Sequence, residues 1–289
     1  MAKLPTDADI LPPSDDHIFK TLLTRPDAKH VLMDVISAAI ERPVVDVLVR
    51  NTELPISDTA EKGERLDVNC TIDGGDQADV EMQSSRMEEK AGDHEHRNFK
   101  NKYIYYGTDL HSSQPSKGKK YAELVRTYQI TFCGYTVLPE RPGFVNRAAL
   151  RFDDGKLFSD QINIVIVEMN KLNDILKRPT AALTPLEMWS AFFQFADKPE
   201  YRDIINHIIE TKEEVGMAAT LLQEISKDEQ ERARFRSRRM FETDMTSNIL
   251  TAEDNGRMRV AMNLKRMGMA VEEIAKATEF TVDEILKLN

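Results

Sequence analysis

The chain has 289 residues, of which 41% are hydrophobic and 30% are charged, a composition typical of a folded globular protein. Its formal net charge of −10, from 39 Lys and Arg against 49 Asp and Glu, argues against a surface that is basic throughout, so any contact with nucleic acid must be local. Two cysteines, Cys70 and Cys133, are too few for a disulfide framework or a thiolate metal cage. Neither a signal peptide nor an apolar run of about 18 residues is visible, so we expect a cytoplasmic protein without a membrane contact.

Two helices are predicted near the N-terminus. The first runs from Asp16 to about Leu23, with Ser14 or Asp15 as its cap, and Pro26 interrupts it. The second ends before Pro43. A carboxylate at Asp16 can simply interact favourably with the dipole of the first helix.

A short strand over 44–49 follows, and then a polar loop over 51–64. Lys62 lies in this loop and Arg65 follows it, just before Asp67. Charged loop residues are usually solvated. Near a phosphodiester, however, these two cations could hold phosphates.

The segment from Arg65 to Gln83 predicts a β-hairpin, because apolar and polar residues alternate on both sides of Asp73-Gly74-Gly75-Asp76. A three-residue loop centred on Gly74 would place the apolar residues of both strands on one face, and Asp67 opposite Glu81 on the other. Like charges across a strand pair are destabilising, and a divalent cation would compensate them. A two-residue Gly74-Gly75 turn would instead separate the two acids onto opposite faces.

A helix is predicted over 92–110 from the spacing of its aromatic residues, which we interpret as a core-facing stripe. Arg97, Lys100 and Lys102 lie on its other side, where they could meet a DNA backbone. The basic turn over 116–121 includes Lys119 beside Gly118. It is either a second phosphate contact or an exposed loop.

Strands over 128–138 and 162–168 complete a predicted α/β sheet, and helices follow from Leu172 onward. An arginine-dense segment over 232–239 is either an ion-paired helix face or a DNA-backbone contact. Asn255-Gly256 is expected to break the helices, and Gly268 to end the next one. The tail resembles a degenerate helix-turn-helix with a Thr281–Glu284 capping box, and it suits helical packing or self-association at least as well as DNA recognition.

The motifs together resemble the PD-(D/E)xK nuclease core. R-L-D-V followed by V-E-M-Q, and preceded by D-x-x-F-K, is similar more narrowly to the recombination-promoting nuclease and putative transposase family. The resemblance covers about 14–171 and resumes in the tail. Gln83 stands where the wider superfamily usually has lysine.

The resemblance implies a restriction-endonuclease-like α/β fold, with a mixed sheet flanked by helices and an all-helical C-terminal region. The corresponding domains are a nuclease-like domain over 1–171, a helical region over 172–254 and a helix-turn-helix-like tail over 255–289. It also implies that Asp67 and Glu81 bind Mg²⁺, with Mn²⁺ as a substitute, and that Asp16 joins them directly or through water. Gln83 would orient the attacking water or a phosphate oxygen by hydrogen bonding.

The activity implied is metal-dependent DNA endonuclease chemistry linked to recombination or transposition. DNA is the expected partner, and Lys62, Arg65, Arg97, Lys100 and Lys119 are the candidate backbone contacts. A catalytically degenerate fold that serves as a DNA-binding or protein-interaction module is the alternative. A homodimer formed through the helical C-terminal region is a further expectation.

Overall fold

The computed structural model describes residues 3–5, 9–50, 68–84, 93–114 and 120–288, without the side chains of 93–97. It divides into two compact units, Met1–Arg232 and Ala233–Asn289. None of the helices in the described ranges is both long and apolar enough to traverse a lipid bilayer.

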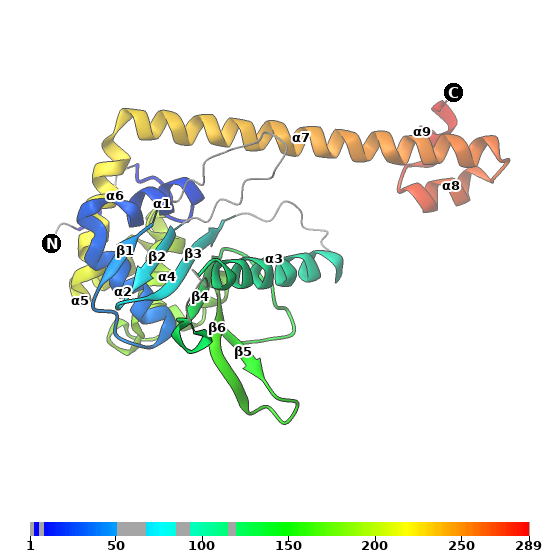
Figure 1. The fold of residues 1–289 in the computed structure, drawn as a ribbon. Helices are drawn as coiled ribbons and strands as arrows, with labels where there is room; N and C mark the ends of the chain where they lie inside the picture. Colours follow the sequence, from blue (N-terminus) through cyan, green and yellow to red (C-terminus); the bar gives the residue numbers. More distant parts are fainter. Residues whose placement is uncertain (1–2, 6–8, 51–67, 85–92, 115–119, 289) are drawn as a thin grey trace. The chain divides into compact units, whose positions relative to one another are not determined.

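The first unit is built on a six-stranded mixed sheet (Figure 1). Its spatial order is β1-β2-β3-β4-β6-β5. The strands are β1 (Val47–Val49), β2 (Val68–Ile72), β3 (Asp76–Gln83), β4 (Thr127–Cys133), β5 (Val145–Arg151) and β6 (Leu157–Glu168). The β3–β4 and β4–β6 pairs are parallel and the other pairs are antiparallel. This sheet, flanked by helices, confirms the predicted restriction-endonuclease-like fold class.

The β2–β3 hairpin has the predicted register. Val68 pairs with Val80, and Ile72 pairs with Asp76 across a three-residue loop centred on Gly74. Gly74 has φ +84°, a left-handed conformation that glycine adopts without strain. Asp67 lies outside the described residues, so its pairing with Glu81 stays a prediction.

Helices cover the two faces of the sheet unequally. One face packs against α1 (Asp16–Thr24), α2 (Lys29–Ile40) and α4 (Pro185–Phe195), and the rings of Phe19, Phe132 and Phe193 meet there at centroid distances of 5.0–6.0 Å. The other face packs against α3 (Asp93–Ser112), as Figure 1 shows. Because neighbours on a strand point to opposite faces, Phe132 faces α1 and Cys133 faces α3.

Helices α4, α5 (Arg202–Thr211) and α6 (Glu213–Lys227) belong to the same compact unit as the sheet. Thr184 begins α4 with a complete capping box to Glu187, and the buried indole of Trp189 donates a 2.6 Å hydrogen bond to Asp34. The functional division into 1–171, 172–254 and 255–289 stays a prediction.

Helix α7 (Glu229–Arg266) has 38 residues, and the predicted break at Asn255-Gly256 is wrong. A glycine inside a helix costs only about 1 kcal/mol, which good helix formers on both sides can offset. Gly268, with φ +81°, does end the helical segment as expected. The tail helices α8 (Val271–Thr278) and α9 (Val282–Lys287) pack with α7 around the buried Ala261, Ile274 and Ile285.

Two strands of the sheet differ from what the sequence predicted. Strand β4 ends at Cys133 rather than near residue 138, and the Gly134 N–H makes the last hydrogen bond to β3 by donating to the carbonyl oxygen of Gln83. Strand β5 was not predicted, since V-N-R-A-A-L-R lacks the alternation of a strand with one buried face. Pairing with the long β6 holds β5 in the sheet, although the sequence of β5 has no strand pattern of its own.

Candidate active site

The candidate site is centred on Glu81, which lies in the middle of the sheet on β3 and is 2% exposed. It shares the α3-facing side of β3 with Gln77, Asp79 and Gln83 through strict alternation. On β4, Gln129 and Thr131 pair with Asp79 and Glu81. A polar row therefore runs along the strands beneath α3.

Two side chains of α3 contact the Glu81 carboxylate. The Tyr103 hydroxyl donates a hydrogen bond to it, and Lys102 Nζ lies 3.6 Å from Oε2. That distance is an ion-pair separation and is longer than a hydrogen bond. Within the described part of the chain, no group donates a hydrogen bond of standard geometry to the buried Oε2. One oxygen of this carboxylate therefore keeps its lone pairs for another ligand.

Asp16 brings a second carboxylate to the same place. Asp15, not Asp16, caps α1, because its side chain accepts hydrogen bonds from the backbone of His17 and Ile18. The Asp16 carboxylate accepts a 3.3 Å hydrogen bond from Ser84 Oγ, immediately after β3. Its charge acts on Glu81, so the helix-dipole role is not its only interaction.

The electrostatics of the site favour a bound cation. Burial raises the pKa of Glu81 above its ordinary value, and Asp16 raises it further, while Lys102 and Tyr103 oppose this rise. Burial also raises the pKa of Tyr103, with the Glu81 charge as the next cause. Both groups are therefore held where a negative charge is costly, and a divalent cation would remove part of that cost.

The residues fit a hard divalent cation such as Mg²⁺. The donors are carboxylate oxygens, one of them buried without a hydrogen-bond donor, and Mg²⁺ prefers such ligands. Among the described residues, no group of three or more His, Cys, Asp or Glu side chains forms a complete metal cluster. Asp67, the predicted further ligand, lies outside them.

Only some of the other predicted site residues lie within the described part of the chain. Gln83 is the last residue of β3, on the same face as Glu81. Lys62, Arg65 and Lys119 lie outside the described residues, and Arg97 lies on α3 without a described side chain. Lys100 is on the surface, 2.9 Å from Glu140. The DNA-contact assignment of these five residues stays a prediction.

Sequence reasoning missed the contacts of Lys102 and Tyr103 with Glu81. Tyr103 belongs to the aromatic stripe assigned to the core, where it does pack. The hydroxyl on a buried tyrosine was the available signal, since such a group usually needs a partner. Lys102 was expected among the basic residues that could meet DNA, but nothing in the sequence pointed to its contact with Glu81, because that contact depends on how α3 lies across β3.

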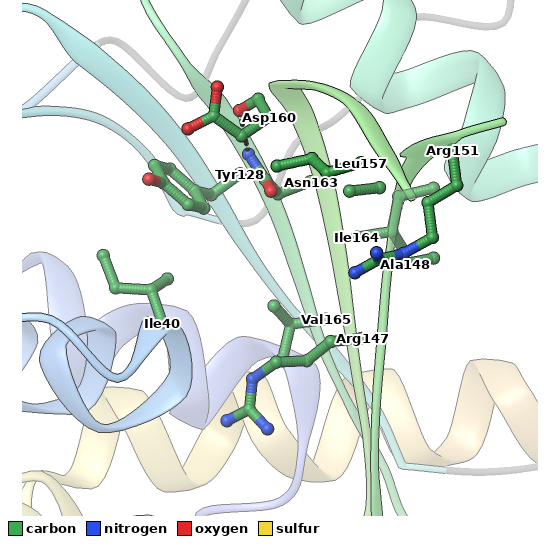
Figure 2. A pocket seen from close by; sticks show the side chains of 11 residues that line it. Ile40, Tyr128, Arg147, Ala148, Arg151, Leu157, Asp160, Asn163, Ile164 and Val165 are labelled. Atoms are coloured by element: carbon green, nitrogen blue, oxygen red, sulfur yellow. Dashed lines mark hydrogen bonds between the residues drawn. The ribbon is translucent and has the colours of Figure 1, made fainter. Parts of the chain in front are cut away.

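A hollow of about 260 Å³ lies over β4, β5 and β6 beside the end of α2 (Figure 2). Its lining includes Tyr128, which points to the opposite face of β4 from Gln129. The guanidinium of Arg147 donates to the carbonyl oxygen of Ala39, and that of Arg151 donates to Gly155. Backbone carbonyls thus engage both cations, and the hollow is not part of the Glu81 site.

Comparison with known proteins gives one result. A family model described as PD-(D/E)XK nuclease family transposase matches residues 13–252. Searches of curated proteins and of solved structures found no significant match. The matched range includes the whole sheet, α3 and the Glu81 site.

Proposed function

The chain belongs to the PD-(D/E)XK nuclease family of transposases, and on that basis we propose that it is a metal-dependent DNA endonuclease acting in recombination or transposition. The observation that carries the proposal is the buried Glu81 carboxylate, with Asp16 beside it and one oxygen without a hydrogen-bond donor in the described structure. A carboxylate buried in this way destabilises a metal-free protein, but it can act as a ligand in a metal site.

Asp67, Glu81 and Asp16 would hold the ion, which we propose to be Mg²⁺ with Mn²⁺ as a substitute. When bound, such an ion supplies a water of lowered pKa and a positive charge beside the phosphate. In the reaction, water adds to phosphorus, one P–O ester bond breaks, and the leaving oxygen takes up a proton. The products are one phosphate-bearing end and one hydroxyl end.

Gln83 would orient the water or a phosphate oxygen, because its amide can donate and accept hydrogen bonds but carries no charge. DNA would be positioned through its phosphates by Lys62, Arg65, Arg97, Lys100 and Lys119. Because the whole chain is acidic, this cationic set would have to act locally.

The alternative proposal is a non-catalytic module, which the absence of lysine at position 83 favours. In that case the helical C-terminal region would carry the function, either by binding DNA or by forming a homodimer interface. Helix α7 supports this alternative through exposed apolar residues such as Met240 and Phe241.

A plasmid-cleavage assay with Mg²⁺, Mn²⁺ or Ca²⁺ tests the proposal. We expect nicking by the wild type with Mg²⁺ and Mn²⁺, and its loss in Asp67→Asn and Glu81→Gln. Asp154→Asn is the matched control, since it removes an exposed carboxylate from the β5–β6 turn. Nicking that survives in both site variants would contradict the assignment.

Metal titration with thermal unfolding separates the two proposals. A metal that binds the native state raises the unfolding temperature. We expect Mg²⁺ to stabilise the wild type and to have little effect on Glu81→Gln. A wild type that gains no stability from Mg²⁺ or Mn²⁺ would favour the non-catalytic module.

A further inference from the structure

We propose that Lys102 of α3 provides the active-site positive charge that Gln83 cannot provide, by contacting a non-bridging oxygen of the scissile phosphate. This inference rests on the proposed nuclease function. Lys102 forms no covalent bond, and its contribution is electrostatic. It would offset the negative charge that develops on the phosphate in the transition state.

The position of Lys102 carries the first step of the argument. Helix α3 covers the face of β3 that bears Glu81, and Lys102 Nζ lies 3.6 Å from Glu81 Oε2. A cation fixed beside the metal-binding carboxylate is also close to any phosphate that the metal binds. A lysine on α3 can therefore reach the reaction centre even though it does not lie on β3, where Gln83 is found.

The surroundings of Lys102 hold its ammonium group in place. Nζ lies 5.0 Å from the ring centroid of Tyr103 and 5.2 Å from that of Tyr106, and 3.4 Å from the Tyr103 hydroxyl. Two aromatic faces and a hydroxyl oxygen limit the rotamers of a side chain that is otherwise flexible. The charge is thus positioned before substrate binds.

The pattern of exposure distinguishes Lys102 from an ordinary surface ion pair. Its side chain is 34% exposed, whereas that of Glu81 is 3% exposed. The ammonium group therefore has a buried acid on one side and solvent on the other, where a substrate phosphate would arrive. Lys100, on the same helix, instead pairs with Glu140, and both of these side chains are about half exposed.

A charge-removal series tests the role. Lys102→Met keeps the apolar stem over Tyr103 and Tyr106 but removes the charge, and Lys102→Arg keeps the charge. We expect kcat for Mg²⁺-dependent plasmid nicking to fall about 100-fold in Lys102→Met, with KM changing much less, and to recover to within about tenfold of the wild type in Lys102→Arg. Lys156→Met is the matched control, because it removes an exposed lysine that pairs with Asp154.

Mg²⁺ binding, followed by calorimetry without DNA, provides the second readout. Because Lys102 competes with the metal for Glu81, we expect Lys102→Met to bind Mg²⁺ several-fold more tightly while cleaving more slowly. Unchanged kcat in Lys102→Met would overturn the inference. So would weakened Mg²⁺ binding, since that would make Lys102 a group that only orders the carboxylate.

Different results would contradict the role of Lys102 and the nuclease function on which it rests. A wild type that binds Mg²⁺ and cleaves DNA, with a Lys102→Met variant that does both equally well, overturns the role of Lys102 alone. A wild type that neither binds Mg²⁺ nor nicks DNA overturns the nuclease function and the role of Lys102 with it.

Discussion

Glu81 is a residue at which function and stability oppose each other. Burial is the main reason that its pKa is raised above the ordinary value of 4.5, and nearby Asp16 adds to the effect. A raised pKa in the folded state means that protonated Glu81 favours folding. This contribution is complete below pH 4.5 and is lost as the pH rises through the folded-state pKa. As the pH rises above 4.5, the metal-free protein therefore loses stability at this position.

Glu81→Gln should consequently stabilise the metal-free protein by ~1 kcal/mol at pH 7 while abolishing cleavage. The stability difference between variant and wild type should grow as pH rises above 4.5, and it should vanish in more acidic buffer. Urea unfolding of both proteins over this pH range, with a chelator present, measures the difference. A variant that is less stable at pH 7 would mean that the contacts of Glu81 with Lys102 and Tyr103 outweigh its burial.

At the scale of single residues, sequence reasoning could propose Glu81, Gln83 and Asp16 as candidate site residues because short motifs carry them. It could not predict that Lys102 contacts Glu81. Motif spacing describes neighbours along a strand or helix, whereas the contact between Lys102 and Glu81 exists only because α3 crosses that face of the sheet. The same limit applies to the Ser84–Asp16 hydrogen bond, which joins residues 68 positions apart.

Among the elements, the ends of β3 and β4 lie too close together at Gly134 to admit a side chain without a shift. A Cβ atom on Gly134 would lie 2.9 Å from the backbone oxygen of Ser84, which has no rotamer through which to move away. The Gly134 N–H also donates a 2.8 Å hydrogen bond to the carbonyl oxygen of Gln83. This glycine therefore lets β4 approach the end of the strand that carries the site.

Gly134→Ala should destabilise the fold by about 1–3 kcal/mol through overpacking, and it should slow cleavage by displacing Gln83 and Ser84. Gly107→Ala is the matched control: its Cβ would meet Gln129 and Ile162 at 3.7 Å, an ordinary contact, and alanine suits a helix interior better. Denaturant unfolding of the two variants tests the contrast. Equal stability of the two would contradict the close approach at Gly134.

The β2–β3 hairpin was predictable to its register because alternation and a glycine turn both specify it locally. Strand β5 was not, since its residues pair with β6 without a pattern of their own. For helix α7 the error is the opposite one, because the sequence predicted a break that the helix does not have. Asn-Gly is a strong local turn signal, yet the chain continues as a helix through it.

For the molecule as a whole, the net charge of −10 makes the distribution of cations decisive for DNA binding. Arg234, Arg236, Arg238 and Arg239 are exposed on α7, within the second unit. The first turn of α9, by contrast, carries the acidic Asp283 and Glu284. We therefore expect the arginines, not the helix-turn-helix-like tail, to be the phosphate contact of this unit.

Replacing these four arginines with glutamine should weaken DNA binding about tenfold at physiological salt. The slope of log K against log salt should become shallower by roughly one for each phosphate that the variant no longer binds. Fluorescence anisotropy of labelled duplexes at several salt concentrations measures both quantities. A slope equal to that of the wild type would show that α7 does not bind phosphate.

The chain has a single tryptophan, and it lies buried in α4, within the sheet-containing unit. Its intrinsic emission therefore reports the melting of that unit alone, whereas far-ultraviolet circular dichroism also records the long helix and its tail. A difference between the two melting curves would show that the two units of the chain lose their structure independently.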